Sequence, residues 1–310
     1  MARFKSGMLS LICALVLVSG FSGCASTRTY KTSILKFQTA SAVVIDNSRS
    51  YLSEVNKTAR DAYIEDCVRN RESIRLDKLY DAQPLSSEAL SLRLATLDDL
   101  TRYGELLYDL ASSNAPEEVQ AGFQELGASL KKINDDVIKD PGESGKGFGQ
   151  CIGPVSEIFG VIAKDLMERK IQAALDKAVE AGKGPVLQLI VAMRDDVVVA
   201  YAQKQDFYSQ RRVLLVDQYN EALKKNEGES VLKAKAENLK AGLTLYEALL
   251  SADPREGFDA MIRAHEALVK YAQSSKQPED LAAFAEAMDD FVSSAKIIAG
   301  AVSELKKIKT

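Results

Sequence analysis

Arg194, Asp195 and Asp196 are the residues whose types are best suited to chemistry, because a pair of carboxylates can serve as general acid and general base. The three lie within a strongly apolar stretch that is predicted to be helical. Adjacent residues of a helix point about 100° apart, so two neighbouring carboxylates do not converge on one substrate. We therefore interpret the group as a candidate buried ion pair, formed with Arg194 or with another helix. An enzyme that uses Asp195 or Asp196 in a cleft remains the alternative.

The chain contains one histidine, His265, which limits the chemistry that imidazole groups can perform. One imidazole cannot build a metal site of several histidines, and we expect no catalytic role for His265. Arg263 and Glu266 lie beside it on a predicted helix, and this setting predicts an exposed or capping histidine. No metal site is expected.

The glycine-rich stretch 142–147 invites comparison with a phosphate-binding loop. That motif requires glycine where this chain has Asp140 and serine or threonine where it has Gly147, and it follows a strand, whereas the preceding residues read as helix. We interpret the stretch as a flexible connector, with a binding loop as the alternative. No nucleotide or other cofactor is expected.

The first 24 residues carry an export signal. Arg3 and Lys5 precede an apolar run of 13 residues at 8–20, and the small residues of Phe21-Ser22-Gly23 lead directly to Cys24. A run of this length is shorter than the roughly 20 residues that span a bilayer.

This pattern resembles the signal peptide of bacterial lipoproteins. The resemblance implies that residues 1–23 are removed and that Cys24 is acylated as the new N-terminus, which anchors the protein to a membrane of the cell envelope. Ala25 in place of aspartate resembles the signal for transfer to the outer membrane in cells with two membranes. The alternative is an ordinary secretory signal that is cut near Ala25 and releases a soluble protein.

Two cysteines remain beyond the signal and the anchor, Cys67 and Cys151. An exported protein meets an oxidising compartment, so the sequence predicts a possible disulfide between them, with two separate buried thiols as the alternative.

The composition favours helices and excludes some partners. The chain has a net charge of −4 that becomes about −6 without residues 1–23, and this acidic balance argues against nucleic acid as a partner. It lacks tryptophan, contains 7 prolines and is rich in alanine, leucine, glutamate and lysine, which favour helix over strand. Basic clusters at Arg69, Arg71, Arg75 and Lys78, and at Lys233, Lys235 and Lys240, read as solvated surface because acidic residues lie among them.

Apolar periodicity and helix-starting prolines predict an all-α, antiparallel multi-helix bundle of about eight helices. The expected parts are a lipidated tether at 24–33, an N-terminal helical half at 34–139, a glycine-rich connector at 140–153 and a C-terminal helical half at 154–310. The helices are expected at 34–83 (one long helix or two collinear pieces), 86–112, 116–139, 154–181, 185–226, 229–252, 254–275 and 278–308. The helix at 185–226 should be the most buried.

Segments 100–107 and 243–250 resemble each other, so the halves are either duplicated four-helix units or similar by chance.

These patterns predict a lipid-anchored, non-enzymatic helical protein that serves as an accessory or scaffold and binds another envelope component. A carrier that holds a lipid or other apolar molecule near residues 186–201 is the alternative, and a cell-envelope enzyme is the third reading.

Overall fold

The computed structural model describes the backbone of residues 5–112, 116–139, 152–159, 163 and 171–308, and most side chains from Thr29 onward. These residues form helices and turns without a strand, which confirms the predicted all-α, multi-helix fold. The helices are α1 (Lys5–Asn70), α2 (Leu76–Asp81), α3 (Ser87–Ser112), α4 (Pro116–Lys139), α6 (Ile171–Lys224), α7 (Glu229–Leu250), α8 (Arg255–Gln273) and α9 (Pro278–Ile308), and residues 152–159 are also helical.

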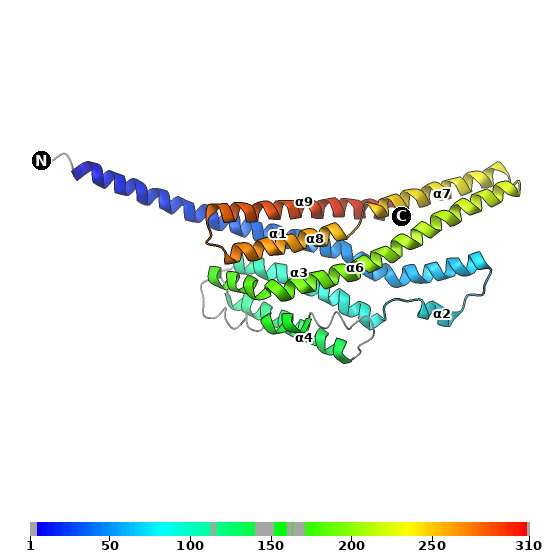
Figure 1. Cartoon of the computed structure of the whole chain (residues 1–310), viewed down its shortest axis with the longest axis horizontal. Coiled ribbons are helices and arrows are strands. Elements are labelled where there is room, and N and C mark those ends of the chain that lie inside the picture. Colours follow the sequence, from blue (N-terminus) through cyan, green and yellow to red (C-terminus); the bar gives the residue numbers. More distant parts are fainter. Residues whose placement is uncertain (1–4, 113–115, 140–151, 160–162, 164–170, 309–310) are drawn as a thin grey trace.

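Helix α1 is the centre of the bundle and contacts α3, α6, α8 and α9 (Figure 1). Its direction relative to α9 follows from two aromatic contacts, Tyr30 with Phe284 at 5.9 Å and Phe37 with Phe291 at 6.0 Å between ring centroids. Both residue numbers rise together, so α1 and α9 run parallel.

Helices α8 and α9 run antiparallel, as expected for helices joined by a short turn (Figure 1). Helices α7 and α8 instead follow each other along α6 in the same direction, since Tyr246 lies against Arg212 and Asp259 against Arg194.

One continuous apolar core joins the elements. Its largest fully buried side chains include Tyr51, Tyr103, Phe123, Tyr201 and Phe258, which come from α1, α3, α4, α6 and α8. Because α1 packs against helices from both ends of the chain, the regions 34–139 and 154–310 do not form separate bundles. The two similar segments also differ in environment, since Tyr103 is buried whereas Tyr246 is partly exposed.

Proline marks helix starts correctly at two positions and incorrectly at a third. Helices α4 and α9 begin at Pro116 and Pro278, where a missing N–H has no consequence. Pro185 was expected to separate two helices, but α6 continues through it. An interior proline costs about 3 kcal/mol. We attribute the continuity to burial of Val186, Leu189 and Ile190 directly after it, which offsets this cost.

The last residues of the predicted tether, 24–33, belong to the packed body. Tyr30 and Ser33 are buried within α1, and the Tyr30 ring lies 4.8 Å from that of Tyr271. Residues 30–33 therefore belong to the packed body, because their apolar and aromatic surface finds partners on α8 and α9. The packed body therefore begins near Tyr30 and not after residue 33.

Two helix ends use a residue in the left-handed conformation. Arg71 follows α1 with φ 57°, and Glu72 N–H donates to the Cys67 carbonyl at 2.9 Å. Asn226 follows α6 with φ 51°, and Glu227 N–H donates to the Ala222 carbonyl at 3.1 Å. These are helix-terminating turns that satisfy otherwise unpaired carbonyl groups. The expected segment 34–83 is therefore two helices and not one, since α1 ends at Asn70 and α2 follows at Leu76–Asp81.

The molecule is elongated, as Figure 1 shows. The beginning of α1 lies at one end, and the turn between α6 and α7 lies at the opposite end. Over the residues whose side chains are described, no helix has the length and apolar character required to cross a membrane.

The prediction that 185–226 is the most buried segment is wrong, because ten of the 19 residues of α8 are buried whereas burial in 185–226 is concentrated in its first part. Residues such as Leu189, Ile190, Met193 and Val197 are fully buried, whereas Val213 is 61% exposed. The difference arises because the first part of α6 packs among several helices and its last turns have few neighbours.

Candidate functional site

The surface that we call the distal arm consists of residues 62–81 and 205–250. It comprises the end of α1, the short helix α2 and the hairpin formed by the last part of α6 with α7, at the end of the molecule far from the beginning of α1 (Figure 1). Of the fourteen exposed large apolar side chains among the described residues, ten belong to this arm: Val68, Ile74, Leu76, Tyr80, Val213, Val216, Leu223, Val231, Leu243 and Leu250. Such a concentration is typical of a surface that binds another protein.

Helices α6 and α7 approach closely within the arm. A side chain at Gly242 would meet the Leu215 Cδ1 atom at 2.5 Å, so the absence of one permits the contact. The Arg212 guanidinium lies 3.5 Å from the centre of the Tyr246 ring, a cation–π contact that joins the same two helices.

The arm also contacts α1. Arg211 donates a hydrogen bond to Glu65 at 2.9 Å, and its guanidinium lies 6.0 Å from the Phe207 ring centre. Burial raises the pKa of Glu65, and the charge of Arg211 partly opposes this shift.

Few apolar residues of the hairpin are buried. Between Phe207 and Ala248, only Phe207 and Ala222 are buried among the apolar residues, and neither belongs to the main core. Two helices that bury so little surface gain little hydrophobic stabilisation from each other, because this term grows with the apolar area removed from water. The exposed stripe of Val213, Val216 and Leu223 therefore resembles half of an interface.

The base of the hairpin is held much more firmly. The Tyr51 hydroxyl donates to the Ala252 carbonyl at 2.5 Å, and the Tyr201 hydroxyl donates to the Leu249 carbonyl at 3.2 Å. The Leu249 carbonyl lies in the last turn of α7 and also accepts from the Ala252 N–H at 3.0 Å, whereas the Ala252 carbonyl lies in the turn that follows the helix. Burial raises the pKa of Tyr201 to about 12, so this hydroxyl keeps its proton and remains a donor.

A buried cation adds to this anchorage. Lys204 is 3% exposed, pairs with Glu54 at 2.8 Å and lies 5.1 Å from the Tyr51 ring centre. The arm thus projects from a rigid base, which favours a fixed orientation relative to the body.

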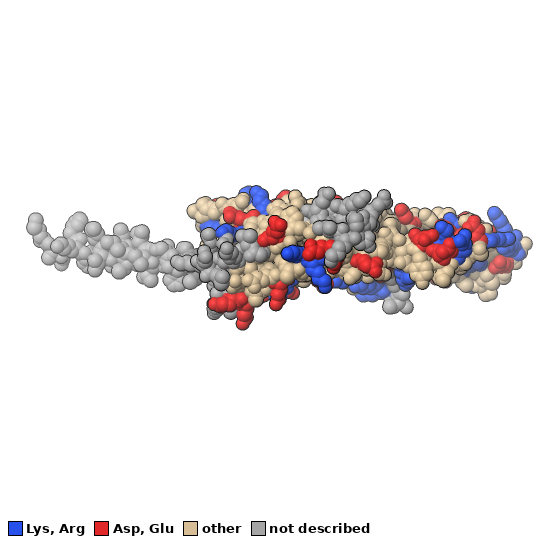
Figure 2. All heavy atoms as spheres, turned by 90° about the horizontal axis from the view of Figure 1, so that it is seen from below, with Lys and Arg blue, Asp and Glu red and all other residues tan. Residues whose placement is uncertain are grey.

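Charges on the arm are balanced and mixed. It carries eleven basic and twelve acidic side chains, and Figure 2 shows blue and red atoms interspersed over this end of the molecule. Five of the seven basic residues of the two clusters are paired locally, for example Lys78 with Asp81 at 3.1 Å and Lys240 with Glu237 at 2.8 Å. No single-sign field arises from such an arrangement.

Asp195 and Asp196, the predicted pair of carboxylates, contact two different arginines. Arg194 contacts Asp195 and Asp259, each at 3.0 Å, while Asp196 lies 2.7 Å from the Nε atom of Arg93 on α3. The two carboxylates therefore point to different partners, as their 100° separation on a helix requires.

Arg93 was not predicted from the sequence. Its side chain is only 4% exposed, and it lies with Asp196 beside a cavity of about 360 Å³. The Arg93 Nε and Asp196 Oδ2 atoms are close enough for an ion pair, but Oδ2 accepts no hydrogen bond of good geometry from the described residues. Burial raises the pKa of Asp196, and the charge of Arg93 opposes that shift. The buried pair thus joins α3 to α6.

His265 is buried, and the expectation of an exposed or capping residue is wrong. It is 0% exposed, its Nε2 atom lies 3.4 Å from the Tyr103 hydroxyl, and its ring lies 6.4 Å from that of Phe37. Burial lowers the pKa of His265 to about 4, so the ring is neutral at pH 7.

Of the two cysteines predicted to form a disulfide, the structure describes only Cys67. Cys67 is buried near the end of α1, whereas Cys151 and the stretch 142–147 lie outside the described residues. Cys24 belongs to the part of α1 whose side chains are not described. The disulfide and the acylation therefore stay predictions.

Comparison of the chain with models of protein families, with curated proteins and with solved structures gave no match. Among the described residues, no group of three or more histidine, cysteine, aspartate or glutamate side chains is placed to hold a metal ion.

Proposed function

We propose that the chain is a lipid-anchored, non-enzymatic protein of the cell envelope, and that it serves as an accessory or scaffold whose distal arm binds a protein partner. The observation that carries this proposal is the position of the exposed apolar side chains. They gather at the end of an elongated body opposite to the end where Tyr30 begins the packed chain. An anchor at one end and a binding surface at the other would place a partner at a distance from the membrane.

The predicted anchor lies close to the body. Tyr30 is already packed against Tyr271, and it follows Cys24 by only six residues. Six extended residues reach about 20 Å at most. Acylated Cys24 would therefore hold the body near the lipid surface. In a cell with two membranes, Ala25 favours the outer membrane, with the protein facing the periplasm.

The chemistry of the arm favours a helical protein partner. Val213, Val216 and Leu223 follow one side of α6 at the spacing of an amphipathic helix, and a helix from another protein can lay its apolar face along such a stripe. The balanced charges around the stripe favour mutual salt bridges. They give no attraction to nucleic acid, and no nucleotide partner is proposed.

A non-enzymatic role is supported by the geometry of the best carboxylate candidates. Asp195 pairs with Arg194 and Asp196 pairs with Arg93, so each carboxylate has its own cation. A general acid and base must instead converge on one substrate.

The anchor is tested by mass spectrometry of the mature N-terminus. We expect the first residue to be Cys24 carrying a diacylglyceryl group, and we expect the variant Cys24→Ser to lose this modification and leave the membrane fraction. An unmodified Cys24 in protein purified from membranes would contradict the anchor.

The arm is tested by photo-crosslinking in intact cells. A benzoylphenylalanine at position 216 or 223 should yield an adduct of one defined mass, because both positions lie in the exposed stripe. Position 297 on α9 is the matched control, since Ile297 is 67% exposed and lies outside the arm.

The mass of the adduct distinguishes the occupants. A partner of a different mass, captured at 216 and 223 but not at 297, would support the proposal. An adduct of twice the chain mass would identify a second copy instead. Equal capture at all three positions would refute the arm as a specific surface.

A further inference from the structure

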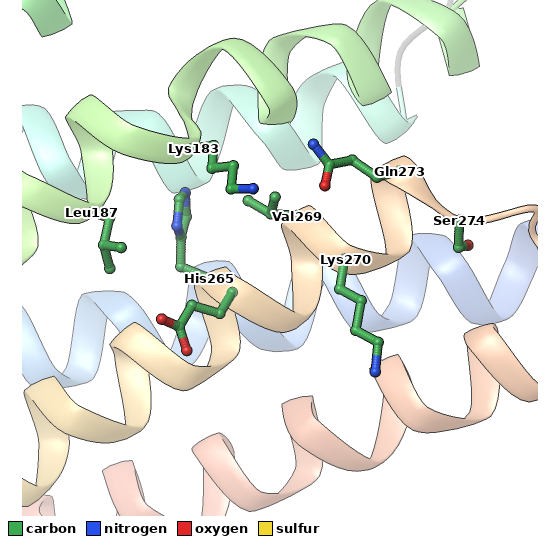
Figure 3. Close-up of a pocket in the computed structure, with 8 residues that line it drawn as sticks. Lys183, Leu187, His265, Val269, Lys270, Gln273 and Ser274 are labelled. Atoms are coloured by element: carbon green, nitrogen blue, oxygen red, sulfur yellow. The ribbon is translucent and has the colours of Figure 1, made fainter.

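A cavity of about 540 Å³ lies between α6 and α8, in the body rather than in the arm. It is lined by Lys183, Leu187, His265, Glu266, Val269, Lys270, Gln273 and Ser274, with mostly apolar surface (Figure 3). Its volume falls within the range of about 300–1,000 Å³ that is typical of small-molecule sites.

Polar groups gather on one side of this cavity. In Figure 3, the Lys183 side chain extends from α6 into the cavity, and the Gln273 amide extends from α8 toward it. Lys183 makes no ion pair with any residue that the structure describes. Lys270 extends in a different direction, away from Lys183 (Figure 3). Lys183 is an exposed residue at the edge of this mostly apolar surface, and neither lysine of the lining has an ion-pair partner among the described residues. The Lys183 ammonium, which is the one that extends into the cavity, can therefore meet one negative charge on a ligand.

His265 supplies a second, independent observation. It lines the cavity and is fully buried, and its Nδ1 atom has no hydrogen-bond partner among the described residues. Buried polar atoms are nearly always paired, so an orphaned one at a cavity indicates a missing partner. The Tyr103 hydroxyl lies 3.4 Å from Nε2, so the ring atom without a partner is Nδ1, which is itself buried beside the cavity.

We infer that this cavity binds a single-chain anionic amphiphile, with its negative group at Lys183 and Gln273 and its apolar chain along Leu187 and Val269. The lining residues comprise two lysines against one glutamate, which gives the cavity a net positive charge. A free fatty acid and a lysophospholipid share this chemistry.

The location suits a ligand of membrane origin. Lys270 precedes Tyr271, whose ring packs against Tyr30 at the end of the body that is nearest to the predicted anchor. The binding argument itself does not depend on the anchor or on the arm.

Native mass spectrometry of the purified full chain with deuterated hexadecanoate tests this inference. We expect one bound molecule per chain. The variant Lys183→Gln should weaken binding about tenfold, the loss that removal of one charged partner gives, whereas Lys183→Arg should stay within about threefold. The matched control Lys270→Gln removes a charge from the same cavity wall and should change the affinity less than about twofold.

Two further compounds test whether the ligand is a phospholipid or a fatty acid, and whether its negative charge is required. Lysophosphatidylglycerol that binds in place of hexadecanoate, with the same sensitivity to Lys183→Gln, would support the site and assign it to phospholipid. Hexadecanol lacks the charge and should bind about tenfold more weakly. Equal binding of hexadecanol and hexadecanoate, equal effects of Lys183→Gln and Lys270→Gln, or the absence of a stoichiometric complex would each overturn the inference.

Discussion

Asp99 should make the folded protein less stable as pH rises from 4 to 7. Its side chain is buried between α3 and α4, where Ser129 Oγ donates a hydrogen bond to Oδ2 at 2.9 Å. Burial raises the pKa of Asp99 from 3.8 to about 7, and the neighbouring charge of Asp98 adds to the shift, while the Ser129 hydrogen bond opposes it.

The sign of the pH effect follows from proton linkage. Below pH 3.8, Asp99 is protonated in both the folded and the unfolded state. Between pH 3.8 and 7 only the folded state keeps the proton, so unfolding releases it and a higher pH favours unfolding. Above pH 7 both states are ionised and the destabilisation is complete. A shift of about three pH units at about 1.4 kcal/mol each gives at most about 4 kcal/mol, and relaxation around the buried charge makes about 2–4 kcal/mol the expected range.

The variant Asp99→Asn isolates this effect because the amide is neutral at every pH and can still accept from Ser129. Urea unfolding followed by circular dichroism should give similar free energies for parent and variant at pH 4.5, and a variant that is about 2–4 kcal/mol more stable at pH 8. The matched control is Asp98→Asn, since the Asp98 side chain is 65% exposed and pairs with Arg49 at 2.6 Å. It should change stability by less than about 1 kcal/mol and keep most of the pH dependence of the parent, because burial is the largest cause of the Asp99 shift and the Asp98 charge only adds to it. If parent and Asp99→Asn keep a constant difference from pH 4.5 to 8, the reasoning is refuted.

Three further predictions concern unfolding free energies at pH 7, each measured by urea unfolding against the parent. Arg93→Met should destabilise by about 2–4 kcal/mol because it leaves Asp196 partly buried without its cation, and the added change Asp196→Leu should recover most of the loss; no recovery would contradict the ion-pair explanation. Tyr51→Phe should cost about 1–2 kcal/mol, since it removes the buried hydrogen bond to the Ala252 carbonyl while keeping the ring, and an unchanged stability would show that this bond contributes nothing. Gly257→Ala should lower stability by about 1–2 kcal/mol, because the new methyl group would lie 2.5 Å from a side chain of α9 and 3.2 Å from one of α1, and a stabilised variant would mean that both can move aside.

Helix starts were the most predictable part of the fold, because their signals are local. Pro116 and Pro278 begin helices with acidic residues in the first turn, a setting that needs no tertiary contact. Helix ends and continuity were less predictable. Arg71 ends α1 in a left-handed conformation usually taken by glycine, and Pro185 lies inside α6. Both outcomes depend on packing that a local pattern does not contain.

The burial of His265 could have been predicted from residues one turn away. Its sequence neighbours Arg263 and Glu266 are charged, but residues that share a helix face are three or four positions apart. Met261 and Leu268 occupy those positions and are fully buried. They place His265 on the apolar face of α8, whereas its adjacent neighbours define the opposite face.

Arg93 and Lys204 could not be assigned from sequence, because each is a charged residue whose partner lies far along the chain. Lys204 pairs with Glu54 on α1, and Arg93 pairs with Asp196 on α6. Buried charges of this kind require a partner at one particular place in the fold. Periodicity identifies the buried face of a helix but not which distant carboxylate will meet it.

Near the end of α6, the apolar sequence predicts buried side chains, but the structure leaves several of them exposed. Residues 213–216 read Val-Leu-Leu-Val, which predicts burial, yet Val213 and Val216 are 61% and 40% exposed. Natural sequences usually agree with their folds at every level, and disagreements concentrate at functional sites. An apolar run that the chain itself leaves in water is consistent with a segment that is buried in an assembly. The partner proposed for the distal arm would remove the disagreement, and its apolar contact surface should therefore cover Val213 and Val216 together.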